Sequence, residues 1–578
     1  MSAGSVKRVS GPLVEVTGLA RIAMSDIVRL GSHRLPGEIV AISGGTATVQ
    51  AFEYTGGLAP GDEAASLGEP LSARLGPHLL GAVLDGLLRP LAGAPAWLDP
   101  AESARSDAGT DGTYEFVPSA KNGDDLGPGA CLGEVPTAGG VKYRVLVPPG
   151  ARGAVSRLRD AGPVAGADLV AVVGGKDVPL VSSWPVRQPR PVAARLDLDA
   201  PLATGQRVVD VLFPVARGGT SAVPGGFGTG KTVLLQQITK WCDADVIVYV
   251  GCGERGNELA EMLTELAGLT DPRTGGKLAR RTVVIANTSN MPMMAREASI
   301  YSAAAVAEHF RDMGLHVVVV ADSTSRWAEA LREFSSRNGE MPAEEGYPAS
   351  LASALAAFYE RAGRFTTLGG DEGSITIIGA VSPAGGDLTE PVTAYTQRYV
   401  RCLWTLDRDL AYARHYPAIS WAGSFARDAD LIAGWHARNG DPGWGTRRSG
   451  LTALLAEADR AGELAELMGA TALPPRQRMA ILAGRLVREG VLQQSAVSQA
   501  DAYCGKDRAA ALADAVLAVS ERCLELAGDG VPPGEIEDQD FSALLRAKDD
   551  VPSPAQVHAV ADTLLNQLGA IRPEGGHE

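Results

Sequence analysis

Four runs of mostly β-branched residues constrain the fold of this chain more strongly than any other feature of its sequence. Each run is apolar over most of its length, as expected for parallel strands buried on both faces. Helical patterns lie between the runs, at residues 295–313 and 347–361. This alternation predicts a parallel sheet covered by helices. The four runs are Val246–Val250, Thr282–Ala286, His316–Val320 and Ser374–Ile378.

The length of the chain, 578 residues, exceeds what one hydrophobic core usually supports, so we expect several domains. Short strands punctuated by Gly and Pro predict a β-barrel over residues 1–70 and a separate β-rich module over residues 111–185. Residues 71–110 and 186–435 are assigned to the α/β domain. From residue 436 to 578, Ala, Leu, Glu and Arg recur at helical spacing, which predicts a helical C-terminal domain. The expected fold class is multidomain α/β.

Composition excludes several classes of protein. The formal net charge of −15 disfavours broad attraction to nucleic acid or to an anionic membrane surface. No apolar run approaches the roughly 18 residues that a membrane helix needs, and the N-terminus lacks the apolar stretch of a signal peptide. The six cysteines contain no CxxC pair, so neither a disulfide framework nor a zinc site is indicated. We therefore expect a cytoplasmic protein that reaches a membrane only through partners.

A glycine-rich segment before the first helical pattern of the α/β region fits the phosphate-binding motif GxxxxGK[ST]. Glycines allow the backbone to turn tightly, so that its N–H groups point at phosphate oxygens, and the helix that follows presents its positive dipole end. The lysine is expected to contact the β- and γ-phosphates, and the threonine hydroxyl to bind Mg²⁺. The segment comprises Gly225, Gly226, Phe227, Gly228, Thr229, Gly230, Lys231, Thr232 and Val233.

An aspartate closes one of the buried strands. Asp322 follows the apolar run that ends at Ala321, and ligands meet parallel sheets at the carboxyl ends of their strands. Taken alone, such an aspartate is more often a cap for the next helix. Together with the phosphate-binding loop, it is better interpreted as the carboxylate that holds the Mg²⁺ water shell.

A second acidic residue follows the strand at residues 246–250. In-line attack on a phosphate needs an oriented, polarised water, which a carboxylate ionised at its reference pKa near ~4.3 can provide. Glu254 is the candidate, with Glu258 as its nearest rival and a loop or capping carboxylate as the alternative role. Arg255 beside it is predicted to contact phosphate or an adjacent subunit, or else to pair with a carboxylate.

Longer, more specific stretches surround these residues: GCGERGNE, TVVIANTSNMPMMAREASIY, ADSTSRWAEALRE, MPAEEGYPASLASALAAFYERAG and GAVSPAGGDLTEPVT. They resemble the catalytic A subunit, or alpha chain, of V-type rotary ATPases and ATP synthases. The similarity runs through nearly the whole chain, including an N-terminal RVSGPLVEV that resembles the family's β-barrel. Residues 111–185 resemble the family's inserted non-homologous, or bulge, region, and the central domain is implied to be RecA-like.

The resemblance implies a place in a rotary complex. A subunits alternate with B subunits, three of each, and ATP hydrolysis or synthesis at A–B interfaces is coupled through stalk subunits, central and peripheral, to proton or sodium transport in a membrane sector. The complex lies on the cytoplasmic face of that membrane. The B subunit supplies an arginine finger, worth about 10³–10⁵ in rate, so this chain alone is expected to be a poor ATPase.

The resemblance also implies the ligands, ATP or ADP with Mg²⁺, and the residues that act on them. Lys231 and Thr232 bind phosphate and Mg²⁺, Glu254 acts on the attacking water, Arg255 supports the γ-phosphate, and Asp322 lies in the metal shell.

The loop departs from the family pattern at two positions. Gly226 replaces a proline, so we expect a looser loop and weaker rather than abolished binding. Thr229 stands where eukaryotic members have a redox-sensitive cysteine, so no thiol switch is expected. Phe227 is expected to pack against the protein.

The expected adenine pocket departs as well. Tyr416 matches the family's stacking aromatic, with core packing as the alternative role. The second aromatic of the family is replaced by Val497, so one face of the base is expected to be less well stacked.

Three other functions are compatible with parts of the sequence. A non-catalytic nucleotide-binding ring subunit would lack the loop lysine or the acidic residues, whereas Lys231, Glu254 and Asp322 are all present. A Rho-like RNA translocase shares the core fold, but the acidic balance and the absence of a basic, aromatic-rich face disfavour it. A protein-export ATPase would lack the insert at residues 111–185.

Overall fold

The computed structural model describes residues 2–95, 98 and 112–571. These residues form two compact units. The first contains the described residues within 2–197, 244–382 and 389–399, and the second contains those within 198–243, 383–388 and 400–571. The predicted boundary at 110/111 and the chain ends at residues 1 and 572–578 lie outside the described residues.

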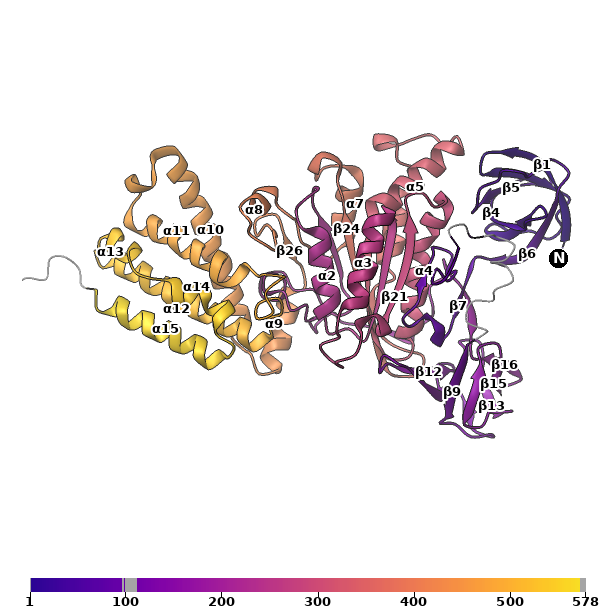
Figure 1. The fold of residues 1–578 in the computed structure, drawn as a ribbon, viewed down its shortest axis with the longest axis horizontal. Coiled ribbons are helices and arrows are strands. Elements are labelled where there is room, and N and C mark those ends of the chain that lie inside the picture. The colour runs from indigo at the N-terminus through magenta and orange to yellow at the C-terminus, as the bar shows by residue number, and fades with distance from the viewer. Residues whose placement is uncertain (1, 96–97, 99–111, 572–578) are drawn as a thin grey trace, which may run out of the picture. The chain divides into compact units, whose positions relative to one another are not determined.

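The first unit begins with a closed six-stranded barrel in the order β1-β2-β5-β4-β3-β6 (Figure 1). Alternating apolar residues such as Val14, Val16 and Val49 point inward and are fully buried, which is the period-two pattern of strands around a filled core. Closure leaves the barrel no free edge. The strands are Ser2–Ser10, Leu13–Thr17, Asp26–Leu30, Leu35–Ser43, Thr46–Ala51 and Glu63–Pro70.

Two four-stranded sheets make up most of the segment between residues 112 and 185, as the sequence predicted. One sheet has the order β10-β13-β15-β16 and the other the order β12-β11-β9-β14, and a short pair, β7 (Ser72–Leu75) with β17 (Ser182–Pro185), closes the segment. The strands of the two sheets are β9 Thr113–Pro118, β10 Asp125–Leu126, β11 Cys131–Pro136, β12 Lys142–Leu146, β13 Gly153–Ser156, β14 Gly162–Ala165, β15 Leu169–Val173 and β16 Lys176–Pro179.

A hydrogen bond between two buried rings ties this β-rich segment to the α/β part of the unit. The hydroxyl of Tyr143 on β12 lies 3.0 Å from Nε2 of His309 on α4 (Met293–Arg311). Arg144 adds an ion pair to Asp371 at 2.7 Å. Burial holds the pKa of His309 well below its ordinary value of 6.5, so the imidazole is neutral in the folded chain.

The four predicted parallel strands lie side by side in the first unit, which confirms the sheet. The order is β24-β22-β20-β21-β8, with antiparallel β23 and β18 beyond β24. Helices α3 to α7 connect or cover these strands (Figure 1). The strands are β8 Val83–Leu84, β18 Ala194–Leu196, β20 Val246–Glu254, β21 Thr282–Thr288, β22 His316–Asp322, β23 Gly363–Thr366 and β24 Glu372–Val381; the helices not yet bounded are α3 Gly256–Gly268, α5 Thr324–Arg337, α6 Leu351–Tyr359 and α7 Pro391–Tyr399.

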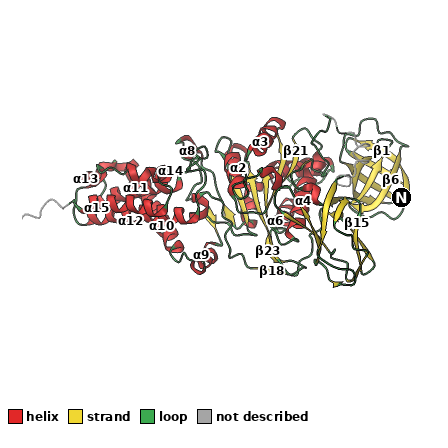
Figure 2. Cartoon of the chain, turned by 60° about the horizontal axis from the view of Figure 1, so that its bottom comes forward, coloured by secondary structure: helices red, strands yellow, loops and turns green. Residues whose placement is uncertain are grey.

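The second unit joins three short strands to a set of helices. β19 (Thr220–Pro224) pairs parallel with β25 (Cys402–Leu403), which pairs antiparallel with β26 (Phe425–Ala426). From residue 429 onward the described chain is helical apart from short connections, as Figure 2 shows and as the sequence predicted. The helices are α2 Lys231–Trp241, α8 Arg408–Tyr412, α9 Ala429–Arg438, α10 Trp444–Met468, α11 Pro475–Val487, α12 Lys506–Gly528, α13 Pro533–Glu537, α14 Ser542–Asp550 and α15 Pro554–Gly569.

The six cysteines are free thiols, and all except Cys131 are buried. Within the part of the chain that the structure describes, no helix combines the length and the hydrophobicity needed to cross a membrane.

Candidate functional site

The phosphate-binding loop of the second unit runs from the end of β19 to the start of α2. Gly228 and Gly230 have φ values of 79° and 83°, in the left-handed region that residues with a side chain rarely adopt. Thr229 is only 2% exposed, and its hydroxyl donates a hydrogen bond to the carbonyl oxygen of Gly226 at 2.9 Å. Thr229 therefore holds the turn closed.

Lys231 is the first residue of α2, so its ammonium group stands at the positive end of the helix dipole. Its Nζ atom donates a hydrogen bond to the carbonyl oxygen of Gly225 at 2.9 Å, which keeps the side chain folded over the loop. Thr232 and Val233 follow on the first turn and are exposed. The loop thus offers a cation, a hydroxyl and helix N–H groups to an anion.

One expectation for this loop is wrong. Phe227 was expected to pack against the protein, but it is 99% exposed. Its position at the tip of the turn, beside Gly228, carries the ring away from the buried end of the loop, where Thr229 lies. The aromatic side chain is therefore available to a ligand or a partner rather than to the core of this chain.

Glu254 ends β20 in the first unit, where burial and neighbouring charge act on its carboxyl group. Burial, followed by the charge of Asp322, raises its pKa to about 7, and the charge of Arg326 acts in the opposite direction. The expectation of a carboxylate ionised at its reference pKa therefore needs correction. A group with a pKa near neutrality accepts a proton more readily than an ordinary glutamate, as a general base should.

Arg255 and Glu258 lie on the exposed start of α3. Their side chains form an ion pair at 3.7 Å, and they are 73% and 46% exposed. An exposed pair of this kind contributes little to stability. Pairing with a carboxylate was one of the roles foreseen for Arg255, and the same contact occupies Glu258, the rival of Glu254.

Asp322 is the last residue of β22 and is 6% exposed. The next helix, α5, has Ser323 rather than Asp322 at its N-cap position, which disfavours the capping role. The hydroxyl of Tyr249 donates a hydrogen bond to Asp322 Oδ2 at 3.1 Å. Because Tyr249 lies on the neighbouring strand β20, this contact fixes the carboxylate at the strand end.

A pocket of about 520 Å³ in the second unit opens beside the phosphate-binding loop. The ring of Tyr416 packs so closely on Gly230 that a Cβ atom there would come within 3.2 Å of the ring. Val497 also lines the pocket and is 94% exposed. The further lining residues that bear on recognition are Val233, Gln237, Gln493, Lys548 and Asp549.

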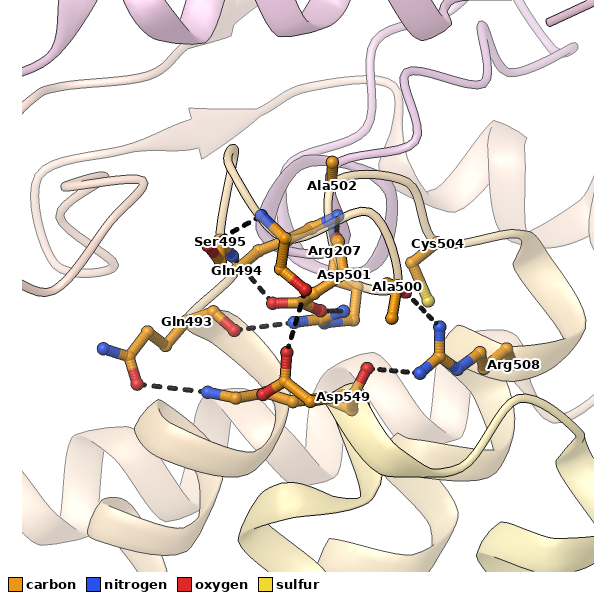
Figure 3. Close-up of polar contacts among 12 residues, drawn as sticks. Arg207, Gln493, Gln494, Ser495, Ala500, Asp501, Ala502, Cys504, Arg508 and Asp549 are labelled. Carbon is orange, nitrogen blue, oxygen red and sulfur yellow. Dashed lines mark hydrogen bonds and ion pairs between the residues drawn. The ribbon is translucent and has the colours of Figure 1, made fainter.

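A buried ion pair holds the segment that carries Gln493 to Val497 (Figure 3). The side chains of Arg207 and Asp501 are both 0% exposed and meet at 2.5 Å. Arg207 also donates to the carbonyl oxygens of Val491 and Gln493, at 2.7 and 2.6 Å. The segment is thereby fixed to the chain around residue 207.

A buried amide completes this attachment. Gln494 accepts from the backbone N–H of Arg207 at 2.7 Å, and its amide nitrogen donates to the carbonyl oxygens of Gly205 and Asp501, each at 2.8 Å. Its own backbone N–H donates to the carbonyl oxygen of Tyr416 at 2.8 Å. Tyr416 and the segment at residues 493–497 are therefore held at fixed positions relative to each other.

Sequence reasoning identified Tyr416 and Val497 but missed Arg207, Asp501 and Lys548. No motif marks these residues, because their partners lie far away along the chain. The sequence gives one indication of this attachment. The polar residues Gln493, Gln494 and Ser495 follow an apolar helical stretch, which is typical of a segment held by hydrogen bonds.

Phosphate recognition by a backbone loop, together with acidic side chains at the ends of parallel strands, is the arrangement of P-loop nucleotide hydrolases, and this chain is one of that class. Family models match four segments of it. They describe the β-barrel domain (residues 6–68) and nucleotide-binding domain (residues 205–426) of the ATP synthase alpha/beta family, that family's barrel-sandwich domain (residues 109–187), and the C-terminal domain of V and A type ATP synthase (residues 433–525).

Proteins similar to nearly the whole chain show which family of P-loop nucleotide hydrolases it belongs to. A V-type ATP synthase alpha chain from Anaeromyxobacter dehalogenans is 48% identical over 98% of both chains, and the corresponding A-type ATP synthase protein from Haloferax volcanii is 44% identical over 92% of both. The chain therefore belongs to the family of V-type ATP synthase alpha chains and their A-type counterparts, whose enzymatic activity is ATP hydrolysis and synthesis. The predicted family, fold class and enzyme class are confirmed.

A solved structure supports the fold. The ATPase EscN from the type III secretion system of enteropathogenic E. coli has a TM-score of 0.65 and 21% identity, and the match covers 89% of this chain and 100% of that one. At this identity the likeness concerns the fold alone. The family match to a barrel-sandwich domain at residues 109–187 covers the β-rich segment predicted at residues 111–185. The presence of this segment was the reason for disfavouring a protein-export ATPase.

Proposed function

We propose that this chain is the catalytic subunit of a rotary complex, in which ATP hydrolysis or synthesis is coupled to proton or sodium transport across a membrane. Lys231 binds the β- and γ-phosphates, Glu254 polarises the attacking water, and Arg255 supports the γ-phosphate once its weak contact with Glu258 is exchanged. Tyr416 stacks on the adenine. The observation that carries the proposal is that Glu254 and Asp322 end the neighbouring parallel strands β20 and β22.

The alternative, a non-catalytic ring subunit, would bind nucleotide without needing a tuned base. Nothing in nucleotide binding itself favours a carboxyl group whose pKa lies near the working pH, whereas proton transfer from water does. The position of Glu254 at the end of β20, beside the strand that ends at Asp322, supports the catalytic role together with this shift of its pKa.

Magnesium fits the oxygen donors that the chain offers. Mg²⁺ keeps several of its waters and binds proteins through one or two oxygen ligands plus substrate phosphates. We assign those ligands to the hydroxyl of Thr232, exposed on the first turn of α2, and to the carboxylate of Asp322, which acts through the water shell. Across the described ranges, no group of three or more acidic, histidine or cysteine side chains forms a dedicated metal cage, and this fits a metal that arrives with its nucleotide.

The partners follow from the family. We propose that the chain alternates with B subunits in a six-membered ring, takes an arginine finger from the neighbouring B subunit, and contacts central and peripheral stalk subunits. Its place is then the cytoplasmic face of a membrane, to which it is attached only through the complex. The exposed side chain of Phe227, at the tip of the phosphate-binding loop, supports a neighbouring chain at this position.

Replacing Glu254 by glutamine tests the catalytic role. In an assembled A–B complex, E254Q is expected to keep its affinity for ATP while turnover falls by about 10²–10⁴, the usual contribution of a general base. E261Q is the matched control, because it removes an exposed carboxylate of the same helix, α3, that does not act on Glu254, and it should retain most of the turnover. Equal turnover of E254Q and wild type would assign the chain to the non-catalytic class.

The phosphate-binding loop is tested separately. Lys231→Ala should weaken ATP binding itself, by roughly tenfold or more, because a charge-assisted contact with phosphate is lost. Titration calorimetry of the full-length chain measures this affinity. An unchanged affinity would mean that the loop does not grip phosphate.

A further inference from the structure

A lysine from the C-terminal helices lines the pocket beside Tyr416. Lys548 lies near the end of α14, beyond the matched C-terminal family segment at residues 433–525. Its side chain is partly buried, and this burial lowers the pKa of its ammonium group. A partly desolvated cation at a pocket wall makes stronger hydrogen bonds than one in water.

Two of the three N–H groups of Lys548 have acceptors in the protein. Nζ donates to the carbonyl oxygen of Glu489 at 2.6 Å and to Oε1 of Gln493 at 3.1 Å. These bonds aim the ammonium group at the segment that faces Tyr416. The described residues offer no acceptor for the third N–H, which leaves this donor for a molecule in the pocket.

Other lining side chains also carry donors, but they are neutral or exposed. One N–H of Gln493 Nε2 donates to the carbonyl oxygen of Arg414 at 3.4 Å, and its second N–H, like the amide nitrogen of Gln237, is a neutral donor. Arg414 is charged but exposed. Lys548 is the partly buried cation of the lining, and a charge-assisted hydrogen bond is roughly twice as strong as a neutral one.

We propose that Lys548 reads the nucleotide base, donating its third N–H to a ring nitrogen of adenine. The inference rests on the proposed function, which places the base against Tyr416. Adenine carries acceptor nitrogens at N1, N3 and N7, and an ammonium group can donate to any of them. Such a hydrogen bond lies at the edge of the base, and it adds affinity that contact with Val497, which has no aromatic ring, does not supply.

A structural role is the competing explanation, because Lys548 also anchors α14. Arg508 provides a matched control for it. Arg508 donates to the carbonyl oxygens of Lys548 and Ala547 on α14 and to that of Ala500, so it anchors the same helix, yet the pocket lining does not include it. Loss of Arg508 disturbs α14 without removing the proposed base contact.

The experiment compares affinities of the full-length chain for ATP and for its 1-deaza, 3-deaza and 7-deaza analogues, each of which lacks one ring nitrogen. Wild type is expected to bind one analogue about tenfold more weakly than ATP, the effect of losing one charge-assisted hydrogen bond. K548M should bind ATP about tenfold more weakly and should no longer distinguish that analogue from ATP. R508M should keep the discrimination, and K548R should restore part of it.

Two results would overturn the inference: wild type that binds all three analogues as tightly as ATP, or K548M that discriminates among them as wild type does. Thermal unfolding of K548M and R508M shows whether both variants disturb α14 to a similar extent. The Tyr416→Ala variant distinguishes a failure of this inference from a failure of the proposed function on which it rests. If that variant binds ATP as wild type does, the base does not occupy the pocket and the proposed site fails. If it binds more weakly while K548M still discriminates, only the role of Lys548 fails.

Discussion

Replacing Arg207 by methionine is expected to destabilise the segment facing Tyr416 by about 3–5 kcal/mol, the usual consequence of leaving one partner of a buried ion pair alone. Both side chains of the pair are 0% exposed, so water cannot solvate the remaining carboxylate of Asp501. That carboxylate would keep the hydrogen bond from the backbone N–H of Ser495 to Oδ2, at 2.7 Å, and the electrostatic attraction of Lys548. The carbonyl oxygens of Val491 and Gln493 would also lose their donor.

Hydrogen exchange measures this effect where it occurs. A loss of about 3 kcal/mol corresponds to a roughly 150-fold fall in the protection of backbone amides, and residues 488–502 are the segment to follow. The double variant R207M/D501L removes both charges, and it should be less destabilised than the two single variants summed, by at least about 2 kcal/mol. ATP affinity should fall in R207M, because the segment that carries Gln493 and Val497 becomes mobile.

The reasoning would be refuted by amides of residues 488–502 that stay protected to within about threefold in R207M. Additive effects in the double variant would contradict it in a second way, because they would show that the two charges do not depend on each other. Arg438→Met is a suitable control, since its ion pair with Asp199 is exposed and contributes little.

Two further predictions concern pH and the loop. Burial lowers the pKa of His309 well below 6.5. Near that pH its imidazole therefore binds a proton in the unfolded chain but not in the folded chain. Unfolding free energy should therefore fall as pH drops below about 6.5, by up to ~1.4 kcal/mol per pH unit, and denaturant titrations should show a shallower fall for H309Q. Gly226→Pro should raise stability by about 0.4–1 kcal/mol and tighten ATP binding, because Gly226 has no positive φ and a Cβ there meets no atom closer than 3.6 Å. A destabilised G226P would show that the loop needs glycine.

The sheet, the loop and the acidic strand ends could be predicted because their signals are local. A strand buried on both faces needs consecutive β-branched residues, as in Val246–Val250, and a phosphate loop needs glycines at fixed spacing. These requirements act on neighbouring residues and so leave a pattern in the sequence. The division into barrel, β-rich segment and helical end follows from composition in the same way.

Other features depend on contacts between distant residues. Asp501 is the partner of Arg207 although 294 positions separate them, and Lys548 reaches the pocket from a helix without a motif. The raised pKa of Glu254 results from burial and from Asp322, neither of which can be read from GCGERGNE. Phe227 was misjudged because an exposed aromatic at a loop tip looks the same in sequence as a packed one.

The parallel sheet of the first unit has a consequence for how the chain is made. The strand β8 pairs with β21, where Val83 lies opposite Val284. These two residues are about 200 positions apart, and residues 198–243 between them belong to the other unit. A ribosome adding about 5–20 residues per second needs roughly 10–40 s to supply that partner. Until then the nascent chain carries a strand without its neighbour, so heterologous expression should profit from slow induction and abundant chaperones.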